Sequence, residues 1–78
     1  MKTTDYFEYT RKRKDRRIIK QEWIEFVIEH PEKTEFQTDG RIKKWAKIED
    51  LNKYLRIILL PDGETVHNAF FDRSFKED

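Results

Sequence analysis

The chain contains no cysteine, only two glycines and two prolines, and no long apolar run. Without cysteine there is no disulfide framework, no thiolate metal site and no cysteine nucleophile. Two glycines cannot build a glycine-rich phosphate loop or a dinucleotide-binding fingerprint. No apolar stretch approaches the length of a membrane span, and no signal-peptide core is present. We therefore expect a cytoplasmic protein with no membrane partner.

Histidine is also scarce. His30 and His67 lie far apart in the chain, and no HExxH spacing is present. This pattern does not support a metal site, so we predict neither a metal nor a cofactor. A triad of Ser74, His67 and a carboxylate could be drawn, but no specific spacing argues for one.

Hydrophobic residues make up 36% of the chain and charged residues 42%. Such a composition favours disorder when the apolar residues are scattered. Here they form periodic blocks, and aromatic residues, at 14%, each bury a large area. We therefore predict one folded domain over residues 1–78, with flexible ends at 1–5 and 76–78.

Positive charge is concentrated near the N-terminus. Residues 11–20 carry seven positive side chains and one negative, a net charge of +6, although the whole chain carries only +1. A local cluster of this kind attracts phosphates even in a nearly neutral protein. A solvated face with no partner is the alternative interpretation.

The clearest helix signal runs from Ile19 to His30. Five apolar residues fall on one face of a 3.6-residue period: Ile19, Trp23, Ile24, Val27 and Ile28. Pro31 ends the segment, because the residue before a proline is pushed out of the helical region. Residues 5–13 are ambiguous, since a short strand and a helical turn fit them almost equally well.

Two hairpins follow. The first joins Glu32–Thr38 to Arg41–Ile48 through Asp39-Gly40, a strong signal for a two-residue turn. That turn would pair Glu35 with Lys44 and Phe36 with Lys43. Strand alternation would place one set of side chains on a single face: Arg41, Lys43, Trp45 and Lys47.

The second hairpin is the most apolar part of the chain. It joins Tyr54–Leu60 to Thr65–Phe71 around Pro61-Asp62-Gly63. A helix followed by four strands predicts an α+β fold, in which the helix covers one face of an antiparallel meander.

The turn of this hairpin decides where His67 lies. A three-residue turn sets His67 opposite Ile57 on the apolar side, and a two-residue turn sets it opposite Ile58 on the side of Arg56. We favour the two-residue register because it brings apolar residues together, Leu59 with Val66 and Leu55 with Phe70. In either register, without a bulge, His67 and Asn68 point to opposite faces.

Cations and aromatic residues alternate along these strands. Cations hold RNA phosphates, and exposed rings stack on bases. Such a surface could also cut RNA without a metal, with one group acting as base, another as acid, and arginines stabilising the developing charge.

Several blocks together resemble a known group of small bacterial and archaeal proteins. They are the arginine-rich first element, the helix pattern up to Pro31, Asp39-Gly40-Arg41, Tyr54-Leu55-Arg56-Ile57-Ile58 and, most specific, Asp62-Gly63-Glu64-Thr65-Val66-His67-Asn68-Ala69-Phe70-Phe71-Asp72-Arg73. This pattern, over roughly residues 6–75, is similar to uncharacterised families related to BrnT and RelE/ParE toxins. The resemblance implies a RelE-like fold, an N-terminal helical segment packed on a three- to four-stranded antiparallel sheet.

RelE- and BrnT-type members are ribonucleases of toxin–antitoxin pairs, whereas ParE-type members act on gyrase. The resemblance therefore suggests an RNA-binding protein with RNA and an antitoxin-like protein as partners, possible endoribonuclease activity, and no metal. The candidate catalytic residues are His67, Arg73 and Arg56. The candidate RNA-binding residues are Arg41, Lys44, Asn68, Arg11, Arg13 and Arg17.

A second hypothesis is a non-catalytic protein-interaction module on the same fold. Related families usually carry a histidine in the first element, where this chain has Phe7-Glu8-Tyr9, and acidic residues here nearly match basic ones.

Overall fold

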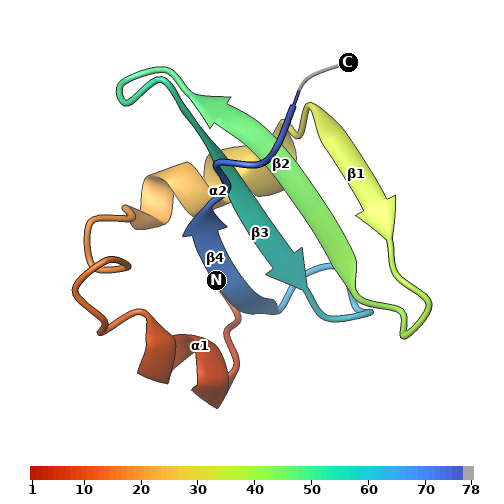
Figure 1. Cartoon of the computed structure of the whole chain (residues 1–78). Helices are drawn as coiled ribbons and strands as arrows, with labels where there is room; N and C mark the ends of the chain where they lie inside the picture. The colour runs from red at the N-terminus through yellow and green to blue at the C-terminus, as the bar shows by residue number, and fades with distance from the viewer. Residues whose placement is uncertain (77–78) are drawn as a thin grey trace.

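The computed structural model describes residues 1–76 and shows a small α+β protein in which two helices precede a four-stranded antiparallel sheet (Figure 1). The elements are α1 (Asp5–Thr10), α2 (Gln21–Glu29), β1 (Lys33–Phe36), β2 (Ile42–Ile48), β3 (Lys53–Leu59) and β4 (Val66–Phe71). The strand order β1-β2-β3-β4 follows the chain. The expected α+β class and antiparallel meander are therefore confirmed, while residues 77 and 78 of the expected flexible end lie outside the described residues.

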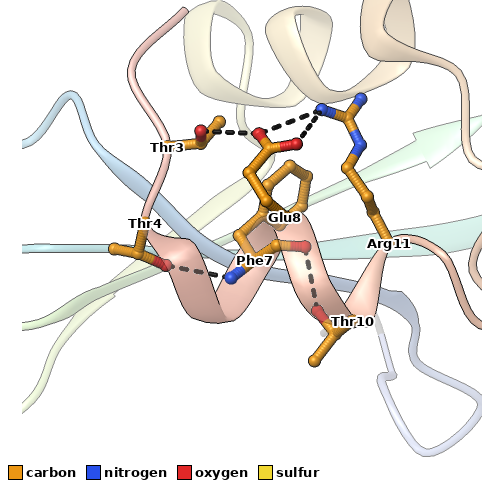
Figure 2. A network of polar contacts seen from close by, with 6 residues as sticks. All are labelled: Thr3, Thr4, Phe7, Glu8, Thr10 and Arg11. Carbon is orange, nitrogen blue, oxygen red and sulfur yellow. Dashed lines mark hydrogen bonds and ion pairs between the residues drawn. The ribbon is translucent and has the colours of Figure 1, made fainter.

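The ambiguous first element is a helix. Thr4 caps it, since its hydroxyl oxygen accepts a hydrogen bond from the Phe7 backbone at 3.0 Å (Figure 2). The Glu8 carboxylate accepts from the Thr3 hydroxyl at 2.6 Å and from the Arg11 guanidinium at 3.2 Å. A side-chain cap of this type satisfies a backbone donor that the first turn leaves free, which favours helix over strand.

The second helix matches its predicted pattern. Ile24 and Val27 are fully buried against the sheet, with exposed fractions of 1% and 0%. Trp23 lies at the margin of the core and meets the Phe71 ring edge-on at 6.3 Å. The acidic side chains Glu22, Glu25 and Glu29 are exposed, as expected.

The core lies between α2 and one face of the sheet. Its buried strand residues come from β2, β3 and β4: Ala46, Ile48, Leu55, Ile57, Leu59, Val66 and Ala69. Phe7 of α1 completes it from the β4 side. Figure 1 shows α2 behind the sheet, α1 beyond its β4 end, and the C-terminal segment crossing β3 and β2.

The predicted register of the first hairpin is wrong by one residue. Glu35 pairs with Lys43 and Phe36 with Ile42. The loop has three residues, 38–40, because Gln37 donates its backbone N–H to the Arg41 carbonyl at 2.8 Å. Gly40 takes a positive φ of 91° at the third loop position, as in hairpins that combine a type I turn with a left-handed residue.

The second hairpin contains a bulge. Leu59 pairs with Val66, as the favoured register predicted, but the register shifts between Ile58 and Leu59. Beyond the shift Ile58 pairs with Asn68, so the predicted pairing of Ile58 with His67 is wrong. Leu55 likewise pairs with Phe71 and not with Phe70. A bulge sets two residues of one strand against one of its partner, which no pattern of alternating side chains reveals.

The start of the chain covers the outer edge of β4. Val66 donates its N–H to the Lys2 carbonyl at 2.9 Å and accepts from the Thr4 N–H at 3.1 Å. Further along β4, Ala69 is bonded through its N–H to the Asn68 side chain and through its carbonyl to Arg16. Residues 2–4, expected from sequence to be part of a flexible end, thus pair with the sheet in this structure.

Within residues 1–76, neither helix has the length and apolar character that crossing a membrane requires.

Candidate nucleic-acid interface

One face of the sheet is not covered by a helix, and we call it the open face. It is the side opposite the core residues of each strand: burial alternates along β3, and on β2 the open-face residue Trp45 is itself buried. The side chains of the open face are Arg41, Lys43, Trp45, Lys47, Tyr54, Arg56, Ile58, Asn68, Phe70 and Asp72. Arg41, Arg56 and Asn68, three of the predicted site residues, therefore share one surface.

Cations and rings alternate across this face. Arg56 lies between two aromatic neighbours, with its guanidinium carbon 5.5 Å from the Trp45 ring centre and 5.1 Å from that of Phe70. Arg16, from the loop before α2, lies 5.3 Å from the Phe70 ring. A planar guanidinium is attracted to the electron-rich face of a ring. These contacts hold two positive charges at fixed places over the sheet.

Asp72 fixes the arrangement from the end of β4. Its carboxylate accepts from the Trp45 indole N–H at 3.0 Å and lies 3.6 Å from an Arg56 terminal nitrogen. Ser74 adds a backbone and a hydroxyl donor. Burial alone would raise the pKa of Asp72, but the hydrogen bonds from Trp45 and Ser74 and the charge of Arg56 together hold that pKa below its usual range.

Arg56 keeps unused hydrogen-bonding capacity. Among residues 1–76 its Nε is buried and has no hydrogen-bond partner, and its contact with Asp72 is longer than a hydrogen bond. A guanidinium carries five N–H donors arranged to bind oxyanions in pairs. An oxyanion from outside the chain could reach only the exposed part of this guanidinium, whose side chain is 22% exposed, and not the buried Nε.

The C-terminal segment lies over one end of the open face. The Phe75 ring stacks on Trp45 at 5.2 Å and contacts Tyr54 at 4.8 Å. Beside it is a cleft of about 260 Å³, lined by Asn52, Lys53, Tyr54, Asp72, Arg73 and Phe75. The exposed Arg73 therefore borders the open face at the far end of β4.

His67 lies at the edge of the sheet, between β4 and α1. Its Nδ1 is 3.1 Å from the Thr4 hydroxyl, and its ring stacks on Tyr6 at 4.8 Å. The direction of this hydrogen bond depends on the tautomer of the ring: when the Thr4 hydroxyl donates to Nδ1, the ring hydrogen is on Nε2. Burial, and then the charge of Arg41, lower the pKa of His67, so the neutral ring is favoured.

This lowered pKa makes the folded state sensitive to mild acid. Because the folded pKa lies below the unfolded value of 6.5, the His67 contribution is intact above 6.5. It is lost as pH falls through the folded pKa, since the unfolded chain then binds the extra proton. We expect the melting temperature to fall between pH 7 and pH 5, and the fall to be smaller in His67→Gln. Equal slopes in the two proteins would contradict this assignment.

Several predicted residues lie elsewhere. Lys44 faces α2 and donates to the Ile28 carbonyl at 3.0 Å, because strand alternation turns it away from Lys43. Arg11 is paired with Glu8, whereas Arg13 and Arg17 are exposed in the loop after α1. The three proposed catalytic residues are also not assembled together. Arg73 lies past the end of β4 at Phe71, whereas His67 lies near the start of that strand and Arg56 pairs with Phe70 between them.

The sequence interpretation missed Arg16, Phe70 and Asp72. Arg16 donates to the Asn68 side chain at 2.9 Å, across 52 residues of sequence. Nothing in a run of seven cations distinguishes this one. The position of Asp72 directly after the β4 segment could have indicated its role. An acid there can accept hydrogen bonds from an indole and a guanidinium on the adjacent strands.

Comparison with known proteins found no matching family model, no similar curated protein and no similar solved structure. Among residues 1–76 no group of three or more histidine or acidic side chains is placed to bind a metal ion.

Proposed function

We propose that this protein binds single-stranded RNA on the open face, as a RelE/BrnT-like protein of the group that its sequence resembles. The observation that carries the proposal is the row of alternating cations and rings, in which Arg56 is held between Trp45 and Phe70. Arginines on such a surface bind phosphates, and half-exposed rings accept bases.

The arrangement favours single strands over duplexes. Phe70 and Phe75 are half-buried rings at the surface, and a base can stack on them only when it is not already stacked and paired in a helix. Arg41 and Lys43 add positive charge along β2, and Arg73 extends it past the end of β4. Each of the three rows of side chains that cross the strands on this face contains one cation: Lys43, Arg56 or Lys47.

Cleavage, as in a toxin–antitoxin ribonuclease, would depend on His67. A neutral imidazole is the form that accepts a proton, and the charge of Arg41 near it would suit a phosphate. Arg73 lies past the C-terminal end of β4 and His67 near its start, so the two side chains are separated. This separation favours the second candidate function, a non-catalytic binding module. An antitoxin-like protein is a proposed partner of the ribonuclease and of the non-catalytic module alike.

Two adjacent lysines provide a matched test. Lys43 lies on the open face and Lys44 on the helix side, so Lys43→Gln and Lys44→Gln remove the same charge at neighbouring positions. We expect Lys43→Gln to weaken binding of a labelled 12-nucleotide single-stranded RNA roughly threefold to tenfold at low salt. It should also reduce the slope of log affinity against log salt by about 0.7. Lys44→Gln should change neither.

Fluorescence anisotropy gives affinity, and gel electrophoresis of the same RNA reports cleavage. Equal losses in the two variants would mean that binding follows net charge and not the open face. Undetectable binding by the wild-type protein at micromolar concentration and low salt would refute RNA binding altogether. Intact RNA with normal binding would leave the non-catalytic module.

A further inference from the structure

The two edges of the sheet differ. At the β4 edge, residues 2–4, Asn68 and Arg16 occupy the backbone groups of Val66 and Ala69. At the β1 edge no described element lies outside the strand, and every residue of β1 is exposed. Phe36 is 76% exposed, the highest value among the large hydrophobic side chains of residues 1–76.

The outer edge of β1 carries backbone groups that can pair with another strand. Gln37 bonds inward to Arg41, and in an antiparallel pair the inward-bonded residues alternate. Glu35 and Lys33 therefore face β2 with their backbone groups, while the N–H and C=O groups of Thr34 and Phe36 point away from the sheet. An uncovered edge of this kind is a template for strand addition.

We propose that β1 pairs antiparallel with β1 of a second copy of this chain, with the two-fold axis passing between the two Phe36 residues. A two-fold pairing is isologous: when residue i of one copy contacts residue j of the other, residue j of the first copy contacts residue i of the second. The two Phe36 residues, whose backbone groups point away from the sheet, exchange two hydrogen bonds. Their rings meet on the same side of the sheet as Ile42, the side that carries α2, at an edge where both rings are exposed. Aromatic pairs across strands stabilise a sheet.

Contact between the Phe36 rings selects this register among the three available. An axis at Glu35 would set that carboxylate against its own copy, which is unfavourable. An axis at Thr34 would set Lys33 against Glu35, which charge favours, but it would set Phe36 against Glu32 and leave the ring in water. The axis at Phe36 faces Glu35 with Gln37, so no like charges meet, and the pairing ends there because residues 38–40 form the hairpin loop.

The oligomeric state of the full chain tests the proposal. Sedimentation across protein concentrations from about 10 to 500 μM should show a concentration-dependent shift to twice the mass of one chain. Phe36→Ser should remain monomeric over this range. Tyr9→Ser, which removes a comparably exposed ring (70%) from α1, should dimerise like the wild type. Far-UV circular dichroism checks that each variant is folded, which the exposure of both rings favours.

Disulfide trapping tests the register, and the absence of native cysteine makes it specific. Under mild oxidation Phe36→Cys should form a covalent dimer, whereas Thr34→Cys and Tyr9→Cys should remain largely uncrosslinked. A wild-type chain that stays monomeric at the highest concentration would overturn the proposal, as would unchanged dimerisation of Phe36→Ser. Preferential crosslinking of Thr34→Cys would overturn the axis at Phe36.

Discussion

Replacing Ile57 with alanine is expected to unfold much of the population. Ile57 is fully buried at the centre of β3, with 0% exposure. Removing such a side chain costs about 2–5 kcal/mol, because transfer free energy is lost and a cavity remains. A domain of this size holds on the order of 5 kcal/mol, so the loss approaches the whole stability. Urea denaturation followed by tryptophan fluorescence measures it.

Ile58→Ala is the matched control, since it removes the same atoms one residue further along the strand. Ile58 is half-buried on the open face and pairs with Asn68 beyond the bulge. We expect a loss of only about 1 kcal/mol. Comparable losses at the two positions would show that both faces of β3 are equally covered and that the open face is assigned incorrectly.

Replacing Asp72 with alanine should cost about 2–4 kcal/mol. The substitution leaves the Trp45 indole N–H and the Arg56 guanidinium without their acceptor in a partly buried site, where side-chain exposure is 9% for Asp72 and 22% for Arg56. Unpaired buried donors and charges are the expensive outcome of breaking such a network. The same urea measurement applies, and a changed tryptophan emission should accompany it because the Trp45 indole N–H loses its acceptor.

Asp15→Ala supplies the control for charge. Asp15 contacts Arg16 at 3.5 Å, but its side chain is 76% exposed, so its removal should change stability by less than about 0.5 kcal/mol. Asp72→Asn, which keeps the size and one acceptor oxygen, should fall between the two. An Asp72→Ala variant as stable as the wild type would show that the carboxylate does not organise the open face.

The sequence was sufficient for elements with a complete local signal. The apolar stripe that includes Ile24 and Val27 identified α2, and the alternation in β2 identified which lysines share a face with Trp45. The first element was left open because Phe7 and Tyr9 fit a strand as well as a helix. The Thr4 cap followed by Asp5 was the signal that could have decided it.

The register errors have a different origin. Asp39-Gly40 is compatible with two loop lengths, and the choice depends on contacts outside the hairpin. A Cβ on Gly40 would lie only 3.0 Å from the Pro61 side chain, so the two turns pack together. The bulge near His67 coincides with the attachment of α1 through Thr4 and Tyr6. Contacts across more than 60 residues are not visible in local patterns.

The candidate site was predictable only in part. Strand alternation turns the more apolar side of β2 and of β3 to the core, which leaves Arg41 and Arg56 together on the other face. Arg16 comes from an irregular loop, and its position depends on Asn68, which itself moved to the open face through the bulge. The order of rings and cations on the open face could therefore be determined only from the structure.

The covered edge at β4 also limits what strand addition can build. A sheet with two free edges can add copies at both ends and grow into a fibre, as exposed strands do in aggregation. Here the N-terminal segment has already taken the backbone groups of Val66, and Arg16 and Asn68 those of Ala69. Growth from β1 would therefore be limited to a single addition, because the edge at either end of the joined sheet is a β4 edge whose backbone groups at Val66 and Ala69 are already bonded.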